Sequence, residues 1–307
     1  MFETFYGLKA NPFTVNPDPR YLYLTRDTRE ALSCLAYGVR NRKGFTLLTG
    51  GVGTGKTTVL NKFMEWLMAE KVTTAFIFNP RLNFSEFLDY MMADFGIPSE
   101  GREKGKLLFH LNRWLLDRYE AGQTAVLIID EAQNLSTEAL EEIRLLTNLE
   151  TSTDKLLQIV LCGQPELEVK LKLPLLHQLW QRITLRCHTR PFTAEELTEY
   201  IKQRLTIAGS NGQPIFRADA LDVIYRYSRG IPRVTNLLCE HALISGFVDQ
   251  ERSISAATIR AVAQDLELQE AGLSTAEGDA VPGPWRESCH RDFLGNAANE
   301  ESYEQNP

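Results

Sequence analysis

The stretch Gly50-Gly51-Val52-Gly53-Thr54-Gly55-Lys56-Thr57 decides the fold class of this chain. It follows the apolar run 45–49 and precedes an apolar periodicity that begins near Thr57, so it joins an expected strand to an expected helix. Glycines let such a loop turn its N–H groups onto phosphate oxygens, and the start of the following helix adds partial positive charge. In this context the pattern predicts a phosphate-binding loop rather than a chance glycine-rich turn.

The loop is expected to hold a nucleoside triphosphate. Lys56 can reach the β- and γ-phosphates, and the hydroxyl of Thr57 can ligate Mg²⁺. The residues expected to contact the nucleotide are Gly50, Gly51, Val52, Gly53, Thr54, Gly55, Lys56, Thr57 and Thr58.

A second motif is the apolar run 126–129 that ends in the two carboxylates Asp130 and Glu131. Asp130 is expected to support Mg²⁺ through its coordination shell, and Glu131 to polarise the attacking water. Acidic residues also suit a helix N-terminus, but the phosphate-binding loop upstream favours a hydrolytic pair. Because no Asn-Lys-x-Asp guanine motif follows a strand, ATP is favoured over GTP.

Gln164 ends another apolar run, Leu161-Cys162-Gly163-Gln164. The carboxyl ends of parallel strands line the ligand crevice, so Gln164 is expected near the γ-phosphate, where it can orient water. The alternative is a turn-forming polar residue before Pro165.

Two arginines complete the candidate site. Arg182 precedes the fifth expected strand and can reach the γ-phosphate of a neighbouring subunit, with Arg186 as its substitute. Arg233 opens a helix and can contact the phosphates within the same chain. Each arginine can equally be an exposed surface residue, as most arginines are.

Alternating strands and helices predict an α/β P-loop fold with a central five-stranded parallel sheet flanked by helices. The expected strands are 45–49, 73–78, 124–129, 157–162 and 183–187, and the expected helices between them are 28–40, 57–69, 84–95, 106–119 and 137–148. From Pro191 onward only helices are expected, at 193–205, 218–228, 233–247 and 256–266. These four helices predict a small helical lid domain.

Composition indicates a soluble globular protein, since 43% of its 307 residues are hydrophobic and its net charge is −7. That charge argues against a surface that coats nucleic acid. The five cysteines and five histidines show no metal-ligand spacing, so reduced thiols and no zinc site are expected. We also expect a cytoplasmic protein without a signal peptide or membrane span, with a disordered acidic tail at 271–307.

With these motifs in order, the chain resembles an AAA+ ATPase. More narrowly, over about residues 1–268, it resembles bacterial ATPases of the ExeA/GspA type, which include the ATPase associated with exosortase (PEP-CTERM) and exopolysaccharide loci. Besides the phosphate-binding loop, the likeness rests on Phe5-Tyr6-Gly7-Leu8, Asn11-Pro12-Phe13, Pro17-Asp18-Pro19-Arg20-Tyr21-Leu22-Tyr23-Leu24, Arg29-Glu30-Ala31-Leu32, Asp130-Glu131-Ala132-Gln133-Asn134-Leu135, Gly163-Gln164-Pro165-Glu166-Leu167 and Gln181-Arg182-Ile183.

The resemblance implies an adenine-pocket segment at 1–30, an ATPase core at 31–190 and a lid at 191–270. It also implies that Asn79 holds Glu131 inactive until a partner binds. A nucleotide-dependent homo-oligomer, a ring or filament, is implied, with partner proteins in secretion or envelope assembly at the inner membrane. ExeA-type proteins continue into a membrane span and a peptidoglycan-binding module, whereas this sequence ends in the acidic segment, which favours the shorter exosortase-associated form.

Two other functions compete with a secretion or exopolysaccharide ATPase. One is a DNA-bound AAA+ ATPase of the transposition-helper class, in which Lys170, Lys172, Arg182, Arg186 and Arg190 would line a pore. The acidic balance and the absence of a DNA-binding tail disfavour it. The other is a nucleotide-dependent scaffold without turnover, which Glu131 argues against.

Overall fold

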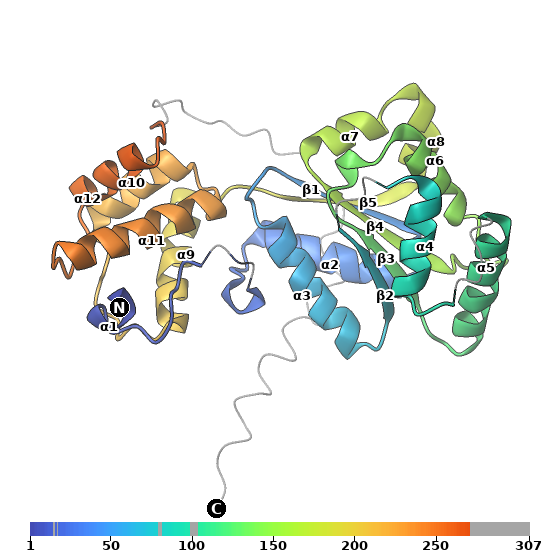
Figure 1. Ribbon diagram of the computed structural model, residues 1–307, viewed down its shortest axis with the longest axis horizontal. Helices are drawn as coiled ribbons and strands as arrows, with labels where there is room; N and C mark the ends of the chain where they lie inside the picture. Colours follow the sequence, from blue (N-terminus) through green and yellow to red (C-terminus); the bar gives the residue numbers. More distant parts are fainter. Residues whose placement is uncertain (15, 17, 79–81, 99–103, 271–307) are drawn as a thin grey trace, which may run out of the picture. The chain divides into compact units, whose positions relative to one another are not determined.

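Figure 1 shows the computed structural model, in which residues 1–14, 16, 18–78, 82–98 and 104–270 are described. Asn79 and the segment 271–307 lie outside the described residues.

The central sheet contains five parallel strands in the order β2-β3-β4-β1-β5. Their bounds are β1 (Phe45–Gly50), β2 (Thr73–Ile77), β3 (Ala125–Ile129), β4 (Leu157–Gly163) and β5 (Ile183–Thr189). β1, β3 and β4 are buried along their whole length, which is why their sequences are nearly continuous apolar runs. The predicted α/β fold with a five-stranded parallel sheet is confirmed.

β5 is an edge strand and extends two residues beyond the end expected at 187. Its residues alternate between buried and exposed, with Arg186 and His188 on the exposed side. Thr189 still pairs with Gly50 of β1. Because one side of this edge strand is exposed, every second residue can be polar. The apolar pattern in the sequence therefore ends before the strand does.

Helices cover both faces of the sheet (Figure 1). α2 (Arg26–Arg40) and α3 (Lys56–Ala69) contact each other and β1 on one face. The other face buries alternate residues of β1 to β4 in one apolar cluster with five helices. These helices are α4 (Phe84–Asp94), α5 (Lys104–Glu120), α6 (Thr137–Leu146), α7 (Pro165–Leu171) and α8 (His177–Arg182). No helix in the described ranges has the length and apolar composition needed to cross a bilayer.

Three short 3₁₀ turns connect these elements: η1 (Pro19–Tyr21), η2 (Ala132–Asn134) and η3 (Pro174–Leu176). Every strand and long helix expected from the sequence ends within two residues of the observed element. The sequence predicted no helix between 163 and 183, where α7, η3 and α8 occur. Pro165 and Pro174 begin α7 and η3, and elements of three to seven residues are too short to show a helical period.

A second apolar cluster is built from the helices after β5. They are α9 (Ala194–Ile207), α10 (Ala218–Ser228), α11 (Pro232–Val248) and α12 (Ala256–Asp265), and they match the expected lid. Their cluster also contains Tyr6, Leu8 and Phe13, which follow α1 (Phe2–Phe5). The backbone N–H of Lys9 donates to the carbonyl oxygen of Ala208 at 2.7 Å. The first part of the N-terminal segment therefore folds as part of the lid.

Gly230 lies between α10 and α11 and packs against Phe192 in the segment that joins β5 to α9, and its replacement by Ala is expected to be strongly destabilising. Its φ is +72°, and an added Cβ would lie 2.0 Å from the backbone oxygen of Phe192. Since backbone on both sides must shift, Gly230→Ala is expected to cost about 3 kcal/mol or more. Denaturant unfolding measures this loss.

Gly105→Ala in α5 is the matched control, because a Cβ at that position meets nothing within 4 Å. It is expected to be neutral or stabilising by up to about 1 kcal/mol. Equal stabilities for the two variants would contradict the steric argument at Gly230.

Candidate functional site

The loop between β1 and α3 has the backbone that its glycines allow. Gly53 and Gly55 have φ values of +76° and +96°. A Cβ on Gly50 would lie 2.0 Å from Oγ1 of Thr189, so only glycine fits where the loop passes β5. The hydroxyl of Thr54 donates to the carbonyl oxygen of Gly51 at 2.8 Å and lies 2.7 Å from that of Thr189. The loop is therefore held against the edge strand.

Lys56 lies within this loop and is only 7% exposed. Its Nζ donates to the carbonyl oxygens of Gly50 at 2.9 Å and Gly51 at 3.1 Å. Lys56 is also the first residue of α3, whose first backbone N–H groups have no partners within the helix. A buried ammonium group and these N–H groups form a cradle suited to phosphate.

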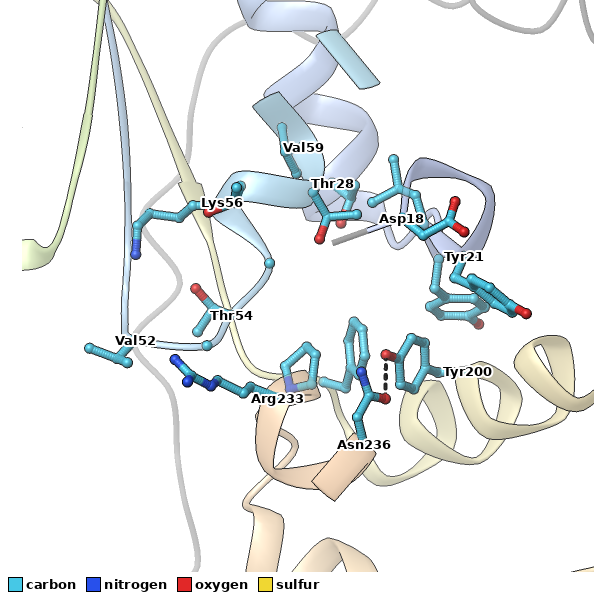
Figure 2. Close-up of a pocket in the computed structure, with 18 of the residues that line it drawn as sticks. Asp18, Tyr21, Thr28, Val52, Thr54, Lys56, Val59, Tyr200, Arg233 and Asn236 are labelled. Atoms are coloured by element: carbon cyan, nitrogen blue, oxygen red, sulfur yellow. Dashed lines mark hydrogen bonds between the residues drawn. The ribbon is translucent and has the colours of Figure 1, made fainter. Parts of the chain in front are cut away.

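The loop forms one wall of a cavity of about 370 Å³, a size typical of small-molecule sites. Figure 2 shows the opposing walls, with Asp18 and Tyr21 from the N-terminal segment and Tyr200 and Asn236 from the lid. Glu131 and Gln164 line the same cavity. Thus the cavity brings together the predicted loop, two strand-end residues and the lid.

Glu131 and Gln164 are in contact although their strand ends are far apart in sequence. Nε2 of Gln164 lies 3.4 Å from Oε2 of Glu131. The backbone of Glu131 has φ +51°, the left-handed region that few residues other than glycine adopt. The side chain of Gln133 joins this pair, a contact that sequence analysis did not predict. Its only sequence signal was its place in the motif that follows Glu131.

Asp130 is 7% exposed, and burial raises the pKa of its carboxyl, while the N–H of Glu131 donates to its Oδ1 at 2.9 Å and opposes that shift. Thr57 lines the cavity. Within the described ranges, no group of three or more His, Cys, Asp or Glu side chains forms a ready metal site. Mg²⁺ typically takes one or two protein ligands together with substrate phosphates and water, so Asp130 and Thr57 are a donor set that fits it.

Arg233, at the start of α11, approaches the loop directly. Its backbone N–H donates to the carbonyl oxygen of Gly53 at 3.3 Å, and a Cβ on Gly53 would lie 2.9 Å from its Cβ. Figure 2 shows its side chain directed toward the loop at Val52. The structure thus places Arg233 beside the glycine-rich loop of the same chain.

Arg182 and Arg186 lie away from the cavity among the described residues. Nη1 of Arg182 donates to the Thr147 hydroxyl and to Oδ1 of Asn148, each at 2.8 Å, just after α6. The guanidinium of Arg186 lies 3.5 Å from the ring centroid of Trp180. The structure does not bring either arginine to the loop of its own chain.

The end of the cavity formed by the lid contains residues that no sequence motif indicated. The hydroxyl of Tyr200 donates to Oδ1 of Asn236 at 2.8 Å (Figure 2), and Nη1 of Arg204 donates to the Tyr200 hydroxyl at 2.7 Å. The Arg204 guanidinium lies 4.4 Å from the ring centroid of Tyr21. These polar groups are buried within helical faces, where sequence analysis expects core residues, so only their packing reveals them.

Residues 39–171 match the family described as AAA domain. The chain is also 46% identical over 248 residues to general secretion pathway protein A of Aeromonas hydrophila, which covers 80% of this chain and 45% of that protein. The chain therefore contains an AAA domain and is related to general secretion pathway protein A. The AAA domain and its P-loop fold imply nucleotide binding.

Two further proteins resemble this chain. It is 28% identical over 144 residues to Mu-like prophage FluMu DNA transposition protein B of Haemophilus influenzae, across 45% of this chain and 42% of that protein. The chain therefore spans less than half the length of either curated relative. The crystal structure of Cdc6p from Pyrobaculum aerophilum matches 86% of this chain and 70% of its own with a TM-score of 0.64 and 18% identity, which shows a shared fold.

Proposed function

We propose that this protein binds ATP with Mg²⁺ in the cavity and hydrolyses it to ADP and phosphate. The observation that carries the proposal is the cavity that loop residues 52–57 share with Glu131, Gln164 and Arg233. The loop N–H groups and Lys56 hold the phosphates, and Thr57 and Asp130 hold Mg²⁺, which neutralises charge on the phosphates when bound. Glu131 accepts a proton from the attacking water, Gln164 orients that water, and Arg233 contacts the phosphates from the lid.

The adenine base occupies the end of the cavity between the N-terminal segment and the lid. Tyr21, Tyr200 and Phe192 supply apolar and aromatic surface there, and Asn236 supplies a polar side chain. Small-molecule sites commonly combine such surface with a few placed polar groups. Because residues 1–30 contribute to this wall and also pack on the lid, base binding joins the N-terminal segment, the loop and the lid.

A homo-oligomer, as a ring or filament, completes the site. Arg182 acts on the nucleotide of a neighbouring subunit, which requires it to leave its hydrogen bonds to Thr147 and Asn148. Arg186 is the alternative donor for this role.

Asn79 restrains Glu131 until a partner binds. Unchanged basal and stimulated turnover in Asn79→Ala would argue against that role.

ATP turnover serves protein secretion or envelope and exopolysaccharide assembly, from the cytoplasm and through partner proteins at the inner membrane. The relative named general secretion pathway protein A, at 46% identity, supports the secretion role. The likeness to exosortase-associated ATPases supports the exopolysaccharide alternative.

A DNA-bound helper of transposition is the second candidate, and the 28% identity to a DNA transposition protein B favours considering it. The two are separated by measuring ATP turnover with and without duplex DNA over a salt series. For a secretion ATPase we expect turnover that DNA changes less than about twofold, since the net charge of −7 disfavours phosphate-backbone binding. Strong stimulation that falls steeply with salt would support the DNA-bound candidate instead.

A further inference from the structure

We infer that Gln133 is a positioning residue for ATP hydrolysis, which holds the Glu131 carboxylate beside Gln164 at the edge of the cavity. This inference rests on the function proposed above. Gln133 lies on η2, the 3₁₀ turn that begins one residue after Glu131, and its side chain is half-buried.

The carboxamide of Gln133 connects the ends of β3 and β4. Its Nε2 donates to Oε2 of Glu131, and its Oε1 accepts from the backbone N–H of Gln164 at 3.1 Å. A backbone N–H can only donate and an ionised carboxylate can only accept, so both contacts require the same orientation of the amide. By making both hydrogen bonds, the Gln133 side chain fixes the distance between the Glu131 carboxylate and the backbone of Gln164.

The surroundings of Gln133 are built to accommodate this bridge. A Cβ on Gly163 would lie 2.6 Å from Oε1 of Gln133 and 2.8 Å from Cδ2 of Leu167, so β4 ends in a glycine where the amide passes. On the other side, Nζ of Lys170 on α7 donates to the carbonyl oxygens of Gln133, at 3.2 Å, and of Leu135. The turn that carries Gln133 is thus held by a helix as well as by its own strand.

The side chain of Glu131 needs hydrogen bonds from other residues to hold it in place, because the backbone of Glu131 is not part of the sheet. It stands outside β3 with φ +51°, and its side chain is half-exposed at the cavity wall. Two amides, from Gln133 and Gln164, converge on its Oε2. A carboxylate held by one oxygen keeps the other available to accept a proton from water. Since a misplacement of about 1 Å can lower a rate about 100-fold, loss of this support is expected to slow hydrolysis between about 10- and 100-fold.

Gln133→Met tests the inference, because methionine keeps the length and volume of the side chain but cannot make either hydrogen bond. We expect kcat for ATP to fall by about 10- to 100-fold, with the Kd of a non-hydrolysable fluorescent ATP analogue changed less than about threefold. Asn134→Met, at the exposed neighbouring position of the same turn, is the matched control and should leave both values unchanged. Gln133→Asn keeps the amide but is one methylene shorter, so it should also lower kcat. This variant tests the inference if Gln133→Met does not fold.

A double variant separates positioning from a structural role. In a Glu131→Gln background, Gln133→Met should lower the residual turnover by less than about twofold, because residues that act as a unit are not additive. The same fold loss in both backgrounds, an unchanged kcat in Gln133→Met and Gln133→Asn, or an equal loss of analogue binding would overturn the inference. A wild-type protein without ATP turnover would instead overturn the proposed function, and with it this role for Gln133.

Discussion

Replacing Glu131 by Gln is expected to lower ATP turnover by about 10²- to 10⁴-fold and to leave ATP binding within about threefold of wild type. The substitution keeps the shape of the side chain and its place at the cavity wall but removes the group that accepts a proton from water. Phosphate release measures turnover, and titration with the fluorescent ATP analogue measures binding. Glu138→Gln, at an exposed position in the first turn of α6, is the matched control and should retain wild-type turnover.

Normal turnover in Glu131→Gln would show that another group is the base. If the assignment is right, the variant should also accumulate nucleotide-bound oligomers, which light scattering detects.

Mixing Glu131→Gln with Arg182→Ala tests action between subunits, since each variant retains the residue that the other lacks. Partial recovery of turnover is expected, and no recovery would argue against Arg182 as the residue supplied by the neighbour.

Lys56→Ala is expected to weaken ATP binding by roughly 10- to 150-fold, because a charge-assisted hydrogen bond contributes about 1.5–3 kcal/mol. Turnover should fall at least as far, since the same ammonium group stabilises charge that develops on the γ-phosphate. The ammonium group now lies against the carbonyl oxygens of Gly50 and Gly51, so it is already placed at the loop. Calorimetric titration with ATP and Mg²⁺ gives the affinity.

Lys62→Ala is the matched control for this loss of charge. Lys62 lies on the same helix but is solvent-exposed, where it pairs with Glu65 at 2.9 Å. Its removal should change ATP affinity less than about twofold, because exposed ion pairs contribute little. Equal affinities for Lys56→Ala and wild type would contradict the placement of the phosphates on the loop.

The sequence by itself determined the strand–loop–helix at Gly50–Thr57, the acidic pair Asp130 and Glu131, and the five-stranded parallel sheet with a helical lid. These features are local: contiguous residues carry the loop chemistry, and strand and helix periods repeat over a few neighbours. The short elements α7, η3 and α8 were not predicted, because they have too few residues to show a helical period.

Only the tertiary structure decided which of these pieces meet. The bridge from Gln133 to Gln164 arises because β3 and β4 are adjacent in the sheet, and the contact of Arg204 with Tyr21 arises because the N-terminal segment packs on α9. Tyr200 and Asn236 are ordinary helical positions until α9 and α11 bring their polar ends together. The physical reason is that local preferences specify each element, whereas burial of apolar faces between distant elements sets the contacts that complete the site.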